Sequence, residues 1–329
     1  MNGSTGEMRI VSSITKGLRN PSFIAIDHKC QYLYVANEVG ESDGYGQRSG
    51  AKATVAVFSI STGSGELTYM HEQITGGEWP CYLTIEKTGK FLLISNYLSG
   101  SVAVLPILSD GRLGEATDSV QHQGSSIIPE RQKGPHPHSV LVSPDNRHVI
   151  VPDLGLDKVL IYKLDLIRGK LIPNEPAFEQ ATPGTGPRHF DFHPSGRYAY
   201  LVTEIDSTII AFEYNQLAGT LKKLQTVSTL PKGFEDYNHC ADLHVSPSGK
   251  FIYGSNRGHD SIVIFAIDQE TGKLTYVNHE STQGATPRNF IIDPTGTWLL
   301  VSNQQSDTIL TFMIDPITGV LEPSGHVAN

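Results

Sequence analysis

The sequence contains few cysteines and no arrangement that would bind a metal or build a disulfide framework. Its 329 residues include three cysteines, Cys30, Cys81 and Cys240, which lie far apart and form no CxxC pair. Two of them fall inside or beside predicted strands, where a cysteine usually serves as a small buried apolar side chain. We therefore predict no metal site and no cofactor.

Long apolar runs and basic runs are also missing. No stretch approaches the roughly 20 apolar residues that span a bilayer, and residues 1–6 have neither a basic nor an apolar leader region. The net charge is −9, and no basic run is interleaved with aromatic residues. This balance argues against nucleic acid or an anionic membrane as a partner. We expect a cytoplasmic protein with a small-molecule partner, and the sequence predicts no particular oligomeric state.

What the sequence does contain is a repeat. A Gly followed two positions later by Leu or Met occurs seven times after a polar turn. These glycines are Gly6, Gly65, Gly111, Gly169, Gly219, Gly272 and Gly319. Between these copies lie six longer segments, each with two apolar stretches joined by a turn, at residues 21–37, 80–96, 137–153, 187–204, 240–256 and 287–303. A repeat of roughly 45 to 60 residues made of strands and turns is typical of a β-propeller.

The third repeat illustrates the predicted unit. Residues 139–142, 148–151 and 159–164 form three apolar stretches, and a fourth opens at Leu171. Four antiparallel strands make one propeller blade. We therefore predict an all-β fold, with residues 1–329 as one β-propeller domain of the seven-bladed type. Six blades would be complete, and residues 6–12 would form an extra outer strand. That strand could dock on the last blade of a closed six-bladed ring, but we favour an incomplete seven-bladed ring to whose seventh blade it belongs.

A polar residue ends the second strand of every repeat. These residues are Asn37, Asn96, Asp153, Glu204, Asn256 and Asn303. Asn and Asp side chains commonly cap turns by bonding the local backbone, which is a sufficient explanation for five of the six. Glu caps poorly, so Glu204 is the exception and a candidate functional residue.

Polar residues also interrupt the apolar inner strands, which face the channel of a propeller. His138, Arg188 and Arg288 open the third, fourth and sixth inner strands, and Arg257 follows the second strand of the fifth repeat. Ligands bind at a channel mouth because several blades can each contribute a side chain to one point. We expect His138, Arg188, Glu204 and Arg257 to converge there.

Several motifs resemble one family. They are Asp153-Leu154-Gly155-Leu156-Asp157, Gly186-Pro187-Arg188-His189, Ser255-Asn256-Arg257-Gly258-His259-Asp260, Asn303-Gln304-Gln305-Ser306-Asp307 and Gln121-His122-Gln123-Gly124. Over essentially the whole chain the sequence resembles the seven-bladed lactonase family, which groups propeller-type bacterial 6-phosphogluconolactonases with fungal carboxy-muconate lactonizing enzymes. Members usually carry two further strands at the start and one more at the end.

The resemblance implies an activity and a site. The activity would be hydrolysis of a sugar-acid lactone, most readily 6-phosphogluconolactone to 6-phosphogluconate in the pentose phosphate pathway. The catalytic residues would be His138, Glu204, Arg188 and Arg257. Substrate-binding residues would be Arg288, His136, Asn256 and Asp153. No cofactor is implied.

The chemistry of these residue types suits an anionic lactone. Hydrolysis needs a base for water, a proton for the leaving hydroxyl and stabilisation of the tetrahedral oxyanion. Glu204 or His138 could serve as the base, and the arginines are fixed cations suited to phosphate, carboxylate or oxyanion. Each arginine could instead form a structural salt bridge.

Other functions compete with lactone hydrolysis. No Gly-x-Ser-x-Gly motif is present, which argues against a serine hydrolase. A muconate cycloisomerase would need a similar anion clamp and proton donor. Asn, Asp and Glu at strand ends could hold a divalent metal, as in six-bladed gluconolactonases. A propeller without catalytic activity could bind a peptide, since fold does not determine function.

Overall fold

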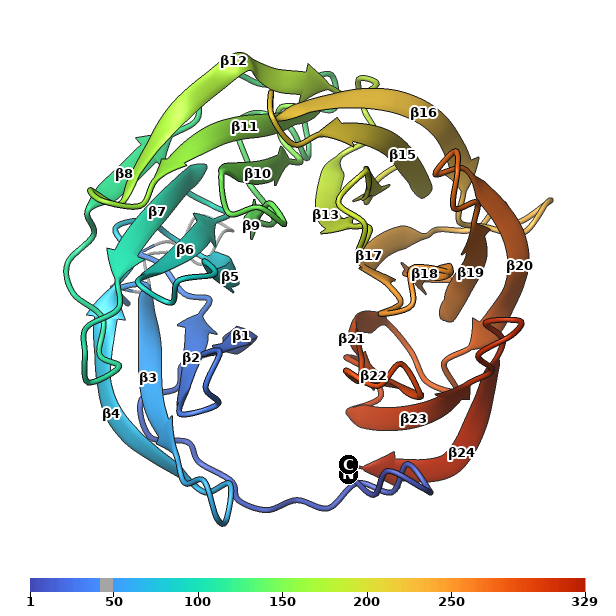
Figure 1. Cartoon of the computed structure of the whole chain (residues 1–329), viewed down its shortest axis with the longest axis horizontal. Helices are drawn as coiled ribbons and strands as arrows, with labels where there is room; N and C mark the ends of the chain where they lie inside the picture. Colours follow the sequence, from blue (N-terminus) through green and yellow to red (C-terminus); the bar gives the residue numbers. More distant parts are fainter. Residues whose placement is uncertain (42–49, 329) are drawn as a thin grey trace. The chain divides into compact units, whose positions relative to one another are not determined.

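The computed structural model describes residues 1–41 and 50–328, and the described residues form β-strands and turns without a helix. The strands make six four-stranded antiparallel sheets, each built from four strands that follow one another in the chain (Figure 1). Ile10–Pro183 forms one compact unit with the first three sheets, and Met1–Arg9 with Gly184–Asn329 forms the other with the last three. The prediction of an all-β fold with six complete four-stranded blades is confirmed.

Each sheet corresponds to one predicted repeat. In the first unit the strands are β1 (Pro21–Ile26), β2 (Tyr32–Asn37), β3 (Thr54–Ile60), β4 (Leu67–Ile74), β5 (Pro80–Ile85), β6 (Phe91–Asn96), β7 (Ser101–Pro106), β8 (Asp118–Gln121), β9 (Leu141–Val142), β10 (His148–Asp153), β11 (Lys158–Asp165) and β12 (Lys170–Gln180). In the second they are β13 (Pro187–Phe192), β14 (Tyr198–Thr203), β15 (Thr208–Asn215), β16 (Thr220–Ser228), β17 (His239–Val245), β18 (Phe251–Arg257), β19 (Ser261–Ile267), β20 (Leu274–Ser281), β21 (Pro287–Ile292), β22 (Trp298–Asn303), β23 (Thr308–Ile314) and β24 (Leu321–Ala328).

The core lies between neighbouring sheets of each unit. Tyr200 from β14 packs in one buried cluster with Ile252 from β18 and Val263 from β19. In the other unit, Tyr34 from β2 shares a cluster with Leu92 from β6. Both faces of the middle strands are covered, which explains their nearly continuous apolar sequences. Burying each such side chain contributes about 1.5–3 kcal/mol.

The turn between the first and second strands follows the predicted chemistry. Gly89, Gly196, Gly249 and Gly296 occupy equivalent turns with φ between 70° and 73°. An L-residue with a side chain rarely adopts this conformation, so glycine is favoured there.

The predicted outer strand at residues 6–12 is wrong, because this segment is irregular. Gly6 has φ +74°, and its backbone lies against the Trp298 ring, whose Nε1 donates a 3.0 Å hydrogen bond to Gly3 O. A strand needs a partner edge, but among the described residues β24 pairs only with β23. The start of the segment therefore packs on the Trp298 side chain, and the segment does not extend a sheet.

One irregularity recurs at the start of every inner strand. In the fourth sheet Pro187 pairs with Thr203 but His189 pairs with Val202, so Arg188 is an extra residue, a β-bulge. The other five sheets show the same one-residue register shift. The register places the bulge residue at Ser22, Cys81, Arg188 and Arg288 in four sheets. In the third and fifth sheets the shift lies between Pro137 and Leu141 and between Cys240 and Leu243, and alignment with the other sheets assigns it to His138 and Ala241. A bulge redirects a side chain out of the regular alternation and is common near active sites.

Candidate functional site

Arg188 and Arg257 share one carboxylate in the second unit. Arg188 Nε donates to Glu204 Oε2 at 2.8 Å, and Arg257 Nη2 lies 2.9 Å from the same oxygen. The exposed fractions of the three side chains are 2% for Arg188, 5% for Glu204 and 13% for Arg257. Three of the four predicted catalytic residues thus meet in one buried cluster.

The surrounding elements explain why they meet. Arg188 is the bulge residue of β13, Glu204 directly follows β14, and Arg257 ends β18. Arg188 Nη1 also donates to Ala241 O, and Arg257 donates to Cys240 O at 2.8 Å. The start of β17 therefore supplies carbonyl acceptors for both guanidinium groups and fixes them against the carboxylate.

Two like charges so close together have an electrostatic consequence. Burial and the neighbouring Arg257 lower the pKa of Arg188 to about 10, although Glu204 opposes this shift. Arg188 is still cationic at neutral pH. The two guanidinium groups in turn favour the ionised form of the Glu204 carboxylate.

Glu204 differs from the residues at the five equivalent strand ends. Asn37, Asn256 and Asn303 donate to the backbone carbonyls of Gly17, Thr229 and Thr282. Asn96 donates to Ser101 Oγ, and Asp153 pairs with the His122 ring. Glu204 instead binds the two arginines. Glu204 therefore differs in its contacts from the other five residues, and its catalytic role stays a prediction.

Asp153 caps the following turn, because its Oδ1 accepts the backbone N–H groups of Gly155 and Leu156 at 3.0 and 3.2 Å, whereas Asn256 bonds Thr229, 27 residues away in the chain. Asn256 is fully buried, and its Oδ1 accepts from Thr229 Oγ1 at 2.8 Å. Asp153, also fully buried, lies with Oδ2 2.7 Å from His122 Nδ1 and accepts the His136 backbone N–H. Their predicted contact with substrate stays a prediction.

His239 belongs to the cluster, although the sequence did not single it out. Its Nδ1 lies 3.8 Å from Glu204 Oε1 and 2.9 Å from the Tyr237 hydroxyl, and a fifth of its side chain is exposed. It opens β17 immediately before Cys240, which takes the place of the proline found in the other repeats. It lies one position before the fifth predicted segment, residues 240–256, so the rule that singled out polar residues opening inner strands did not reach it.

Arg288 is the bulge residue of β21, as Arg188 is of β13. Its side chain is half-buried. It forms no hydrogen bond or ion pair with any residue that the structure describes. It is near enough to Arg188 to contribute to the lowered pKa of that guanidinium.

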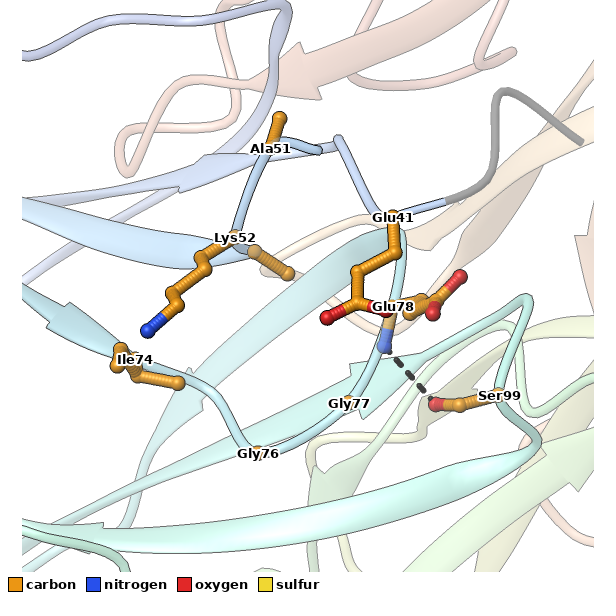
Figure 2. Close-up of a pocket in the computed structure, with 9 residues that line it drawn as sticks. Glu41, Ala51, Lys52, Ile74, Gly76, Gly77, Glu78 and Ser99 are labelled. Carbon is orange, nitrogen blue, oxygen red and sulfur yellow. Dashed lines mark hydrogen bonds between the residues drawn. The ribbon is translucent and has the colours of Figure 1, made fainter. Parts of the chain in front are cut away.

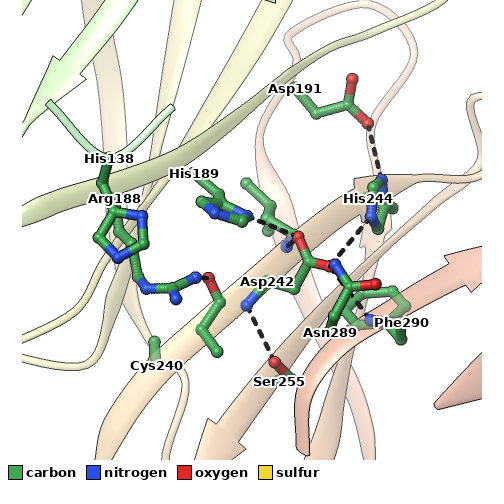
Figure 3. Close-up of polar contacts among 12 residues, drawn as sticks. His138, Arg188, His189, Asp191, Cys240, Asp242, His244, Ser255, Asn289 and Phe290 are labelled. Atoms are coloured by element: carbon green, nitrogen blue, oxygen red, sulfur yellow. Dashed lines mark hydrogen bonds and ion pairs between the residues drawn. The ribbon is translucent and has the colours of Figure 1, made fainter. Parts of the chain in front are cut away.

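A second polar network, centred on Asp242, links three inner strands (Figure 3). Asp242 Oδ1 lies 2.7 Å from His189 Nδ1, and Oδ2 lies 3.3 Å from His244 Nε2. From β21, Asn289 Nδ2 and the Phe290 N–H donate to Oδ2 at 2.5 and 3.1 Å. One buried carboxylate thus joins β13, β17 and β21 beside Arg188 and Arg288.

The two histidines of this network carry different charges. Burial and the adjacent Arg188 lower the pKa of His189 to about 4, so its ring is neutral. Burial also lowers the pKa of His244, but the Asp242 and Asp191 carboxylates outweigh it and raise that pKa to about 9. Against the effect of its burial, the same histidines hold the pKa of Asp242 well below its usual range. The network is therefore an ion pair between Asp242 and His244, with His189 as a neutral partner.

His138 and His136 lie in the first unit. His138 is buried, with Nδ1 3.9 Å from Cys81 Sγ and its ring edge-on to Tyr97. His136 stacks on Tyr97, and its Nδ1 lies 2.9 Å from Tyr97 O. The prediction that His138 joins Glu204 in one site stays a prediction.

A surface pocket of about 430 Å³ lies elsewhere in the first unit. Figure 2 shows Lys52, Glu41 and Glu78 around it, with Ser99 Oγ accepting the Glu78 N–H at 3.0 Å. None of its lining residues is a predicted site residue.

Within the described ranges, no group of three or more His, Cys, Asp or Glu side chains could hold a metal ion. The described part of the chain also has no helix with the length and apolar character of a membrane span.

Comparison with known proteins identifies relatives along the whole chain. Residues 1–328 match the family model described as lactonase, 7-bladed beta-propeller. The 6-phosphogluconolactonase of Bacillus subtilis is 38% identical over 276 residues, which cover 84% of this chain and 75% of the relative. The 6-phosphogluconolactonase of Formosa agariphila is 36% identical over 295 residues, covering 89% and 80%.

A solved structure agrees with this assignment. The periplasmic gluconolactonase of Pseudomonas aeruginosa matches with a TM-score of 0.90 and 33% identity, covering 100% of this chain and 89% of its own. The sequence-based resemblance is thereby confirmed, and the chain belongs to the seven-bladed β-propeller lactonase family.

Proposed function

We propose that this protein is a lactonase that hydrolyses 6-phosphogluconolactone to 6-phosphogluconate, a step of the pentose phosphate pathway. The observation that carries the proposal is the buried Glu204 carboxylate held between Arg188 and Arg257. The names of the relatives from B. subtilis and F. agariphila support the choice of lactone. The anionic substrate would meet a cluster whose net charge is positive.

The arginines suit the charged transition state. Attack of water on the lactone carbonyl places negative charge on the carbonyl oxygen, and preorganised cationic donors stabilise that charge. Arg188 is almost fully buried and bonded to Glu204 and Ala241 O, so its role is to hold the carboxylate in place. Arg257 is more exposed and is the better candidate to donate to the oxyanion.

Glu204 is poorly suited to be the base that activates water. Two guanidinium groups stabilise its ionised form and so reduce its tendency to accept a proton. An imidazole fits that role better, because its unperturbed pKa lies near neutral pH. We assign proton transfer to a histidine: the sequence predicts His138, and His239 lies 3.8 Å from Glu204. The kinetics of His138→Gln and His239→Gln decide between them.

The test is a direct assay of 6-phosphogluconolactone hydrolysis, corrected for spontaneous opening. Glu204→Gln should lower kcat/KM by about 10²-fold or more, because the cluster loses the charge that orients both arginines. Glu213→Gln is the matched control, because Glu213 is an exposed residue of β15 that pairs only with Lys222 at 3.2 Å among the described residues. A wild-type rate equal to spontaneous opening would refute the proposal.

The same assay format separates the alternatives. Turnover of a carboxy-muconate without lactone hydrolysis would indicate a cycloisomerase, and loss of activity after chelation would indicate a metal. Absence of turnover with every substrate would favour a binding module.

The proposal also includes one propeller domain of the seven-bladed type, supported by the family description, of which six sheets are described here. It includes a cytoplasmic location, where sugar phosphates are metabolised, although the P. aeruginosa relative is named as periplasmic.

A further inference from the structure

Arg288 differs from the two arginines that bind Glu204. Arg188 and Arg257 each donate hydrogen bonds to the Glu204 carboxylate and to a backbone carbonyl of β17. Arg288 occupies the bulge position equivalent to that of Arg188, but nothing in the described part of the chain bonds its guanidinium. A half-buried arginine with all its donors unused is poised to bind an anion.

The backbone at Arg288 is held in place on one side. The next two residues, Asn289 and Phe290, both donate to the buried Asp242 carboxylate. Asp242 also lies 2.7 Å from Nδ1 of His189, the residue that follows Arg188. The two bulges are therefore tied through a single carboxylate, which fixes how their arginines are presented.

The local charges indicate which anion fits. Arg188 and Arg257 bind the single carboxylate of Glu204, and Arg288 is near enough to Arg188 to lower its pKa. The cationic His244 lies between two other carboxylates, Asp242 and Asp191. Arg188, Arg257, Arg288 and Glu204 together carry a net charge of about +2 at neutral pH. A phosphate monoester carries a charge of about −1.5 to −2 at pH 7 and offers three strong acceptor oxygens. An unphosphorylated sugar lactone carries no charge and would leave this excess unbalanced.

We infer that Arg288 binds the phosphate group of the substrate and selects phosphorylated over unphosphorylated lactones. This inference rests on the proposed function. Under this assignment Arg257 interacts with the reacting carbonyl, and Arg288 with the remote phosphate. A remote charge-assisted contact of this kind discriminates between substrates without taking part in bond making.

The experiment compares kcat/KM for 6-phosphogluconolactone and for unphosphorylated gluconolactone in the wild type, Arg288→Ala and Arg288→Lys. Arg288→Ala should lower the value for the phosphorylated lactone by about 10²-fold and that for the unphosphorylated lactone by no more than about 3-fold. Arg288→Lys should recover part of the loss, because it keeps the charge without the planar fork. Equal losses on both substrates in Arg288→Lys, with an unchanged melting temperature, would overturn the inference.

A binding measurement keeps this inference separate from the proposed function. Titration with inorganic phosphate should give at least 10-fold weaker binding to Arg288→Ala than to the wild type. Arg197→Ala is the matched control, because Arg197 is an exposed arginine of the same unit that bonds Tyr198 Oη. If the wild type hydrolyses neither lactone, the proposed function fails, and this titration alone tests Arg288. Unchanged phosphate affinity in Arg288→Ala would then overturn the inference.

Discussion

Replacing Asp242 with Asn should destabilise the protein strongly, although the two side chains have nearly the same shape. The carboxylate is 3% exposed, pairs with His244, and accepts hydrogen bonds from Asn289, Phe290 and the backbone N–H of Leu243. Removing one partner of a buried ion pair typically costs about 3–5 kcal/mol of unfolding free energy. The His244 ring is one third exposed, so solvent screening places the expected loss at the lower end, about 3 kcal/mol.

The pH dependence gives this prediction a second signature. The pKa of His244 is raised to about 9 from 6.5, so its contribution is complete below pH 6.5 and is lost as the pH rises through 9. The pKa of Asp242 is lowered, so its contribution is present above about pH 4 and disappears only in stronger acid. In Asp242→Asn the loss of stability between pH 6.5 and 9 should therefore be much smaller than in the wild type.

Urea unfolding at pH 6.5 and at pH 9.5 measures both effects. Asp191→Asn is the control for the loss of stability alone, because the Asp191 carboxylate is 29% exposed and 4.0 Å from His244, whose pKa it also raises. The control should lose about 1 kcal/mol or less, as partly exposed pairs do. A loss below 1 kcal/mol for Asp242→Asn, or a pH dependence identical to that of the wild type, would refute the ion pair described here.

Two further predictions concern the cluster around Glu204. Arg257→Ala should lower kcat/KM by about 10²-fold with little loss of stability. Arg188→Ala should also lower the melting temperature, because the Arg188 guanidinium is fully buried. Near-wild-type kinetics for Arg257→Ala would overturn its catalytic role. Gly258→Ala should destabilise the protein by about 1–3 kcal/mol, because a Cβ there would lie 2.1 Å from Tyr237 O at φ +133°. Gly63→Ala, with open space around it, should be neutral, and equal unfolding midpoints for the two variants would contradict this account.

The strands and part of the site could be predicted because both depend on local patterns. Apolar alternation and turn glycines located the repeats, and the poor capping ability of Glu singled out Glu204. Its contact with Arg188 follows from residues 16 positions apart on neighbouring strands. These features require only short-range geometry within one hairpin.

The other contacts could not be predicted because they depend on the register between sheets. Asp242 looks like an ordinary strand residue, and its contact with His189 joins positions 53 residues apart. The acceptors for Arg188 and Arg257 are backbone carbonyls, which have no sequence signature. The wrong outer strand at residues 6–12 has the same origin, since a motif does not reveal whether a partner edge is present.

The recurring bulge has a consequence for how such a protein can change. Its residue lies outside the regular register, so the apolar alternation that holds the sheets together does not require an apolar side chain there. The six equivalent positions accordingly hold side chains as different as Ser22, Cys81, His138, Arg188, Ala241 and Arg288. Two positions later every repeat has an apolar residue: Ile24, Leu83, Val140, Phe190, Leu243 and Phe290. A single substitution at one of these positions can therefore alter which molecules are bound without changing the fold. A protein built by duplication of one blade can thus acquire new binding specificities one residue at a time.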